Sequence, residues 1–221
     1  MKRRDFVKLL SIGVSGIFIP ASGRTRAAFA AQKSAPAKPG YEGIARLLKY
    51  VDPLPIPSHL QPVRGKGRLE YKVRMMQFQQ KLHSQLQPST LWGYEGKYPG
   101  PVIEGVVNEP VSIEWINQLP EQHLFEIDTK IHGAMPPTPA VRTVAHLHGA
   151  NTASDDDGLP EKWIRPGHSA TYHYPNKQRA ATLWYHDHAL GITRLNNYAG
   201  LSGLYLLRGE EEKSLNLPAG P

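Results

Sequence analysis

The pattern His-x-His occurs twice in this chain, at His146 and His148 and again, forty residues later, at His186 and His188. Both copies are surrounded by residues that favour β-strands. Because side chains alternate faces along a strand, residues i and i+2 point to the same side. Two such strands in one sheet or sandwich can therefore bring four imidazoles to one place. Neutral imidazole is a ligand for copper, zinc, iron and nickel, so the two pairs predict a metal site.

The alternative for the two pairs is a set of polar residues on exposed strand faces. Their neighbours Val144, Leu147, Leu183 and Trp184 argue against it, because they indicate buried strands, and buried imidazoles need partners. Trp184 and Tyr185 are interpreted as core residues. Six single histidines are interpreted as surface or hydrogen-bonded structural residues: His59, His83, His123, His132, His168 and His173.

An acidic run, Asp155 to Asp157, follows the first pair. It is either a solvated loop that caps the next segment or the source of a carboxylate that acts near the metal as a base or proton donor. The residues alone leave both interpretations open. A zinc hydrolase would need a carboxylate or a further histidine as ligand. Asp187 is a poor candidate for that ligand, because its side chain should point to the strand face opposite the histidines.

Composition limits the classes of function. The 221 residues suffice for one domain with a core, and the formal net charge is +7. The first thirty residues account for +5 of that charge, so the remainder carries only +2 and gives no electrostatic footprint for nucleic acid. The chain has no cysteine, so it can form neither a disulfide nor a thiolate copper site by itself.

Residues 1–30 are typical of a twin-arginine export signal. Arg3 and Arg4 open a basic start, 9–20 is a short apolar run, and 28–30 reads Ala-Phe-Ala, an A-x-A cleavage site. The alternative is a cytoplasmic amphipathic start. The apolar run is too short to span a bilayer, so we expect no membrane span in the mature chain and a periplasmic or extracellular location. Residues 31–46 are interpreted as a flexible leader.

Short alternating segments separated by Gly- and Pro-rich turns predict an all-β sandwich or barrel with no long amphipathic helix. The proline-rich segment 51–57 is expected to be an extended strap across the domain. Residues 209–221 are interpreted as the start of a linker. The predicted strands are 69–75, 90–94, 102–104, 110–116, 141–148, 168–174, 182–186 and 203–207.

His-Leu-His-Gly at 146–149 and Trp-Tyr-His-Asp-His at 184–188 resemble the first cupredoxin domain of multicopper oxidases. The resemblance extends over residues 47–218 and is strongest to the bacterial spore-coat laccases and bilirubin oxidases. It implies a single cupredoxin (plastocyanin-like) Greek-key β-sandwich over 47–208. Further segments that carry the resemblance are 51–57, 91–94, 99–101, 174–179 and 193–200.

In that family, three cupredoxin domains form one oxidase. A type 1 copper in the third domain takes electrons from a phenolic, aromatic or metal-ion substrate. A trinuclear copper cluster between the first and third domains reduces dioxygen to water. The resemblance implies that His146 ligates the type 2 copper, that His148 and His186 ligate one type 3 copper, and that His188 ligates the other. It also places Asp157 where the family keeps an acid that assists proton delivery.

The chain departs from the family pattern because it lacks the second domain, the cysteine-containing third domain and the other four cluster histidines. Three interpretations follow. The chain is the amino-terminal part of a laccase-like oxidase that acts with the missing domains or with a partner chain, or it is a stand-alone exported copper-binding module, or it is an inactive truncated remnant. The remnant would expose the surface that normally packs on the other domains.

Overall fold

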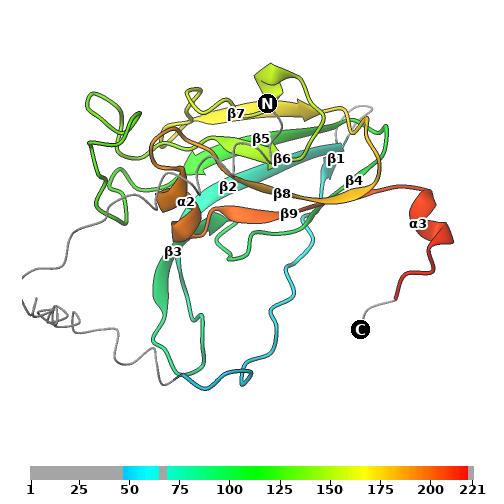
Figure 1. The fold of residues 1–221 in the computed structure, drawn as a ribbon, viewed down its shortest axis with the longest axis horizontal. Coiled ribbons are helices and arrows are strands. Elements are labelled where there is room, and N and C mark those ends of the chain that lie inside the picture. The colour runs from blue at the N-terminus through cyan, green and yellow to red at the C-terminus, as the bar shows by residue number, and fades with distance from the viewer. Residues whose placement is uncertain (1–46, 65–68, 219–221) are drawn as a thin grey trace, which may run out of the picture. The chain divides into compact units, whose positions relative to one another are not determined.

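A computed structural model describes residues 47–64 and 69–218 (Figure 1). Within this part, nine strands form two sheets, and the only helical segments are three short ones. No helix among these residues is long and apolar enough to cross a membrane. The predicted signal (1–30) and leader (31–46) lie outside the described residues.

The first sheet is centred on β2 (Leu69–Gln80), which is long enough to pair with three strands. Along one edge it pairs antiparallel with β1 (Val63–Arg64) and then with β3 (Ser89–Tyr94). Along the other edge it pairs parallel with β5 (Val111–Gln118), and β5 pairs antiparallel with β7 (Ser169–Tyr174). The sheet is therefore mixed, as expected where strands that are distant in sequence become neighbours.

The second sheet has the strand order β4-β9-β8-β6. Its members are β4 (Ile103–Val106), β6 (Ala145–His148), β8 (Ala181–Asp187) and β9 (Ser202–Arg208). The pair β4–β9 is parallel, and the pairs β9–β8 and β8–β6 are antiparallel. This sheet carries both histidine pairs.

The core lies between the two sheets. Because side chains alternate faces along a strand, every second residue of each sheet faces the other sheet. These residues form one buried cluster, which includes Val73 and Trp115 of the first sheet and Tyr185 and Leu207 of the second. Trp115 lies 5.3 Å from Tyr185, ring centre to ring centre, and donates its indole N–H to the Tyr174 hydroxyl at 3.3 Å. Such aromatic pairs stabilise the fold beyond the contribution of apolar burial alone. The predicted all-β sandwich is confirmed.

One predicted strand is shorter than expected. Residues 141–144 precede β6 and do not belong to it, because their polar groups have other partners. The Arg142 guanidinium is buried and donates to three backbone carbonyls, and the Val144 N–H donates to the Asp187 carboxylate. No local sequence pattern predicts α2 (Thr193–Ala199), which follows β8.

Segment 51–57 forms neither helix nor strand, as expected of a proline-rich strap. It is joined to the sandwich at both ends. The Asp52 carboxylate accepts the Ser84 N–H at 3.0 Å, and the Ser58 carbonyl accepts the Val102 N–H at 2.8 Å. At the other end of the chain, α3 (Glu211–Ser214) falls within the segment interpreted as the start of a linker, an interpretation that stays a prediction.

Candidate metal centre

The two histidine pairs lie on neighbouring strands. β6 and β8 are antiparallel, and their register sets His146 opposite His186 and His148 opposite Trp184. Residues directly opposite in such a pair project to the same face. The intervening residues Leu147 and Tyr185 are buried in the core, so the histidines occupy the other face of the sheet.

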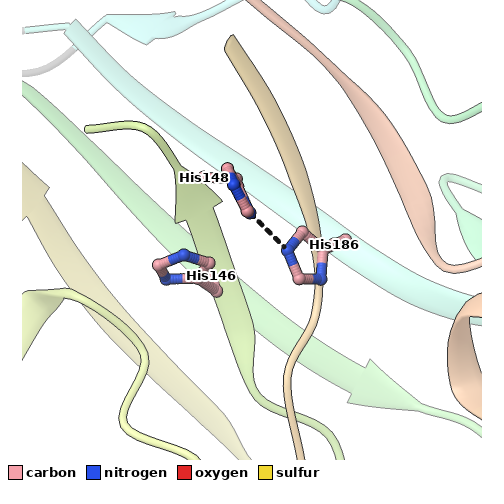
Figure 2. Close-up of side chains that lie close together, drawn as sticks. All are labelled: His146, His148 and His186. Atoms are coloured by element: carbon pink, nitrogen blue, oxygen red, sulfur yellow. Dashed lines mark hydrogen bonds between the residues drawn. The ribbon is translucent and has the colours of Figure 1, made fainter. Parts of the chain in front are cut away.

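Three of the four imidazoles converge closely. His146, His148 and His186 each offer a ring nitrogen, and these nitrogens all lie within 4.8 Å of one another. The His148 Nδ1 and the His186 Nε2 are 3.2 Å apart and form a hydrogen bond, with the His146 ring beside them (Figure 2). Three imidazole nitrogens at this spacing can converge on bound metal ions.

His188 follows the last residue of β8 and completes the group. Its ring centre lies 5.1 Å from that of His146 and 5.7 Å from that of His186. Its Nδ1 is buried and has no hydrogen-bond partner in the structure. An unsatisfied buried polar atom is costly unless something else binds it. The orphaned nitrogen and the all-imidazole donor set together fit a copper, zinc, iron or nickel ion.

Hydrogen bonds to backbone carbonyls orient two of the imidazoles. His146 Nδ1 donates to the Asp157 carbonyl at 2.5 Å, and His186 Nδ1 donates to the Asp187 carbonyl at 2.8 Å. Each bond makes Nε2 the unprotonated nitrogen of that ring, which is the atom that would bind a metal, as is usual for histidine ligands. Burial lowers the pKa of His186 to about 4, so this ring is neutral at pH 7.

Asp187 anchors the second pair from the other side of the strand. Its side chain is fully buried, and the hydrogen bonds of its carboxylate go to residues other than the four histidines. The carboxylate accepts the Val144 N–H at 2.8 Å, the Ala189 N–H at 3.0 Å and the Asn196 amide at 2.8 Å. Burial raises the pKa of Asp187 to about 6, so the group is mainly ionised at pH 7. These bonds tie the end of β8 to the start of β6 and to α2.

The acidic run divides into three different environments, and its first two residues belong to the short 3₁₀ helix η2 (Ser154–Asp156). Asp155 is exposed and pairs with Lys162, and Asp156 accepts the His173 N–H at 3.0 Å. Asp157 lies beside His146, with its carboxylate 3.6 Å from the His146 Nδ1 and with a side chain that is 41% exposed. Only this member of the run is a neighbour of the imidazole cluster.

The interpretation of Trp184 as a core residue was wrong. Its side chain is 39% exposed, whereas Tyr185 is fully buried. The reason is the strand alternation itself, because Trp184 and His186 are two residues apart and share the outer face. The indole lies 4.0 Å from the His186 ring, centre to centre, with the planes at 24°. Alternation along the strand, counted from His186, predicts that Trp184 lies on the outer face. Its apolar character favours the core instead, and this indication was wrong.

Sequence reasoning also missed the buried polar residues behind the site. Asn196 of α2 donates to the Asp187 carboxylate and to the Arg142 carbonyl, and it accepts a hydrogen bond from His123 at 2.9 Å. The Asn197 amide donates to the Asp187 carbonyl at 3.2 Å. No local sequence pattern predicts these contacts, because they depend on how α2 packs against β6 and β8.

The protein is a β-sandwich with an imidazole cluster on one face of its second sheet, and the comparisons with known proteins concern this same region. The multicopper oxidase family model matches residues 138–212, which include all four histidines. The laccase of Bacillus subtilis is 47% identical over 184 residues, and the laccase of Haloferax volcanii is 41% identical over 191 residues. The chain therefore carries a multicopper oxidase domain and is similar to laccases over most of its length.

A solved structure supports the same assignment. The laccase of Pediococcus acidilactici superimposes with a TM-score of 0.63 at 25% identity, over 76% of this chain and 32% of that chain. The aligned part covers 78% of this chain and 36% of the Bacillus subtilis laccase, and 79% and 33% in the case of Haloferax volcanii. The chain thus spans about a third of the length of the relatives that it matches.

Proposed function

We propose that this chain is the amino-terminal part of a laccase-like oxidase that couples oxidation of phenolic, aromatic or metal-ion substrates to reduction of dioxygen to water. The observation that carries the proposal is the register of β6 and β8, which gathers His146, His148 and His186 on one face, with the His188 ring 5.1 Å from that of His146. The identity to laccases over most of the chain supports the same reaction.

The proposed cofactor is copper, as the type 2 and type 3 ions of a trinuclear cluster. His146 holds the type 2 ion, His148 and His186 hold one type 3 ion, and His188 holds the other. The 3.2 Å between the His148 Nδ1 and the His186 Nε2 supports a shared ion, because two nitrogens at metal–imidazole distances of about 2.0 Å lie about this far apart. When bound, copper supplies the electron transfer to dioxygen.

Asp157 is the proposed proton donor at the cluster. Its carboxylate lies close to His146, yet its side chain is 41% exposed and can exchange protons with solvent. Its backbone carbonyl binds the same imidazole, so one residue both orients a ligand and brings an acid to the site. The other two acids of the run have partners elsewhere.

The remaining copper ligands must come from another part of the protein. The chain has no cysteine and so cannot supply the type 1 thiolate. We infer that a second and a third cupredoxin domain, in the same polypeptide or in a partner chain, contribute the type 1 copper, the substrate pocket and four further histidines. We also infer export through the twin-arginine signal at 1–30, to the periplasm or the cell exterior.

Reconstitution tests this function. The chain is co-expressed with a cysteine-containing cupredoxin chain and loaded with copper, and oxygen consumption with a phenolic dye is measured. We expect oxidation that His148→Ala abolishes and that the exposed control His132→Ala leaves unchanged. Copper-loaded complexes that consume no oxygen would overturn the oxidase proposal.

A second candidate is a stand-alone copper-binding module, which is favoured because all four imidazoles lie within this one chain. Isothermal titration of the full chain with Cu(I) and Cu(II) separates the two candidates. Tight binding without oxidase activity in any reconstituted complex supports the module. Failure of the chain alone to bind copper contradicts the module, and failure of the reconstituted complex to bind copper contradicts both candidates and leaves the inactive remnant.

A further inference from the structure

The paired strands β6 and β8 form a grid of four side chains on the outer face, and only three of them are histidines. The register sets His146 opposite His186 and His148 opposite Trp184. The indole therefore occupies the fourth corner of the grid, where a further imidazole would complete the pattern. Its other cross-strand neighbour, Leu204 of β9, lies on the side away from the histidines.

Trp184 contacts two of the imidazoles and not merely the nearest one. Its ring stacks on His186 with centres 4.0 Å apart and planes at 24°, and it lies 5.2 Å from the His148 ring with planes at 31°. These are the two rings that hydrogen-bond to each other at 3.2 Å. The indole thus lies beside both rings of this hydrogen-bonded pair.

The three rings differ in what else holds them. His186 is 5% exposed and has a carbonyl partner for its Nδ1, whereas His148 is an exposed side chain with no hydrogen bond except the one to His186. An exposed imidazole held by one bond can rotate about its side-chain torsions. The other rings beside His148 are those of Trp184, at 5.2 Å, and His146, at 5.6 Å, and of these only Trp184 lies at a low angle to the imidazole.

We propose that Trp184 is a positioning residue that holds the imidazoles of His148 and His186 ready for one metal ion. The inference rests on the proposed copper site, and it adds a role for a residue that binds no metal. Stacking fixes the ring planes before the ion arrives, so less conformational entropy is lost on binding. Aromatic area alone does not suffice, because the effect requires a flat ring parallel to the imidazole.

The first test needs no metal. We measure the motion of the histidine rings in the metal-free full chain by ¹³C relaxation of the imidazole Cε1–H groups. Trp184→Leu should raise the mobility of the His148 and His186 rings and leave the buried His123 ring unchanged. Trp184→Phe, which keeps a flat ring, should preserve the order. Leu204→Ala is the matched control, because it removes a side chain that is 37% exposed on the same face of the sheet.

The second test is titration with Cu(II). Trp184→Leu should weaken binding about 10-fold, as loss of a residue that orients a ligand commonly does, and should change the electron paramagnetic resonance spectrum of the bound ion. Trp184→Phe should restore both properties, and Leu204→Ala should match the wild type. Equal effects of Trp184→Leu and Leu204→Ala, or no rescue by phenylalanine, would overturn the proposal.

The two tests keep the proposals separate. A wild-type chain that binds no copper contradicts the copper site, and the relaxation measurement then still decides whether Trp184 orders the rings. Rings that are as ordered in Trp184→Leu as in the wild type overturn the positioning role, even where copper binds tightly. Loosened rings with unchanged copper affinity and spectrum overturn it as well.

Discussion

His123 and the imidazole cluster are two histidine environments of the same domain that differ in what satisfies their ring nitrogens. His123 accepts the Phe125 N–H at 3.0 Å on Nδ1 and donates to Asn196 at 2.9 Å from Nε2, and its ring packs edge-on against Trp92. His188 has a buried Nδ1 with no partner. Both nitrogens of His123 are satisfied by residues of the fold, whereas the orphaned Nδ1 of His188 remains available to a ligand from outside.

The largest effect is expected from removing two ligands of the cluster. His148→Ala with His186→Ala should weaken Cu(II) binding by more than about 100-fold, because even loss of a residue that only orients a ligand costs about 10- to 100-fold. Titration calorimetry measures the affinity. The exposed His132→Ala is the control, and equal binding by the double variant and the control would remove the distinction between the two environments.

The converse change tests the other environment. His123→Ala should lower the free energy of unfolding by about 3 kcal/mol, because it opens a cavity beside Trp92 and leaves Asn196 without its donor. Denaturant unfolding of the metal-free chain measures this loss. His148→Ala, which truncates an exposed side chain, should cost less than about 1 kcal/mol. A larger loss for His148→Ala than for His123→Ala would reverse the comparison.

Asp187 links the two environments, because it is bonded to Asn196 and lies between His186 and His188. Asp187→Asn should destabilise the fold by about 1–3 kcal/mol, since the amide turns one of two accepting oxygens into a donor that faces backbone N–H groups. Thermal unfolding checks the size of the effect. A variant as stable as the wild type would show that the carboxylate does not anchor β8.

The smallest effect concerns pH. The pKa of His186 is about 4 in the folded chain, below the ordinary histidine value of 6.5 that applies in the unfolded chain. The unfolded chain therefore binds the proton more readily. The stability contributed by this ring is present above pH 6.5 and is lost as the pH falls towards 4. The difference in stability between the wild type and His186→Ala should therefore shrink by on the order of 1 kcal/mol over that range.

Asp187 titrates in the opposite sense, since its pKa of about 6 when folded lies above the ordinary 3.8. Its burial destabilises the fold above pH 6, and the penalty disappears as the pH falls towards 3.8. Both chains in the comparison carry Asp187, so its contribution largely cancels in the difference. A difference that grows as the pH falls would contradict the burial of His186.

Regular alternation made most of the scaffold predictable from the sequence. Segments such as 110–116 and 182–186 carry a period-2 pattern that their burial in the sandwich requires. The first coincides with β5 from residue 111 onward, and the second lies within β8. The same reasoning placed Asp187 on the face opposite the histidines. The strand prediction was wrong for 141–144, because hydrogen bonds to residues distant in sequence decide the structure there. Arg142 donates to a loop carbonyl, and the Val144 N–H donates to Asp187.

The sequence predicted that the histidines would cluster, but it did not predict the residues that surround the cluster. The spacing i, i+2 on two strands suffices to put two imidazoles on a face, and the pairing of β6 with β8 then joins the pairs. The prediction that Trp184 is a core residue fails because apolar character alone does not decide which face of a strand a side chain occupies. The contacts of Asn196 depend on the packing of α2, which no local pattern specifies.

The measurement that tests the central claim most directly is pulsed electron paramagnetic resonance of the full chain loaded with Cu(II) and ¹⁵N-labelled at histidine. Coupling of the unpaired electron to several imidazole nitrogens is expected, and it should be lost in the His148→Ala/His186→Ala chain and retained in His132→Ala. A copper signal with the same histidine couplings in the doubly substituted chain would place the ion elsewhere and contradict the account.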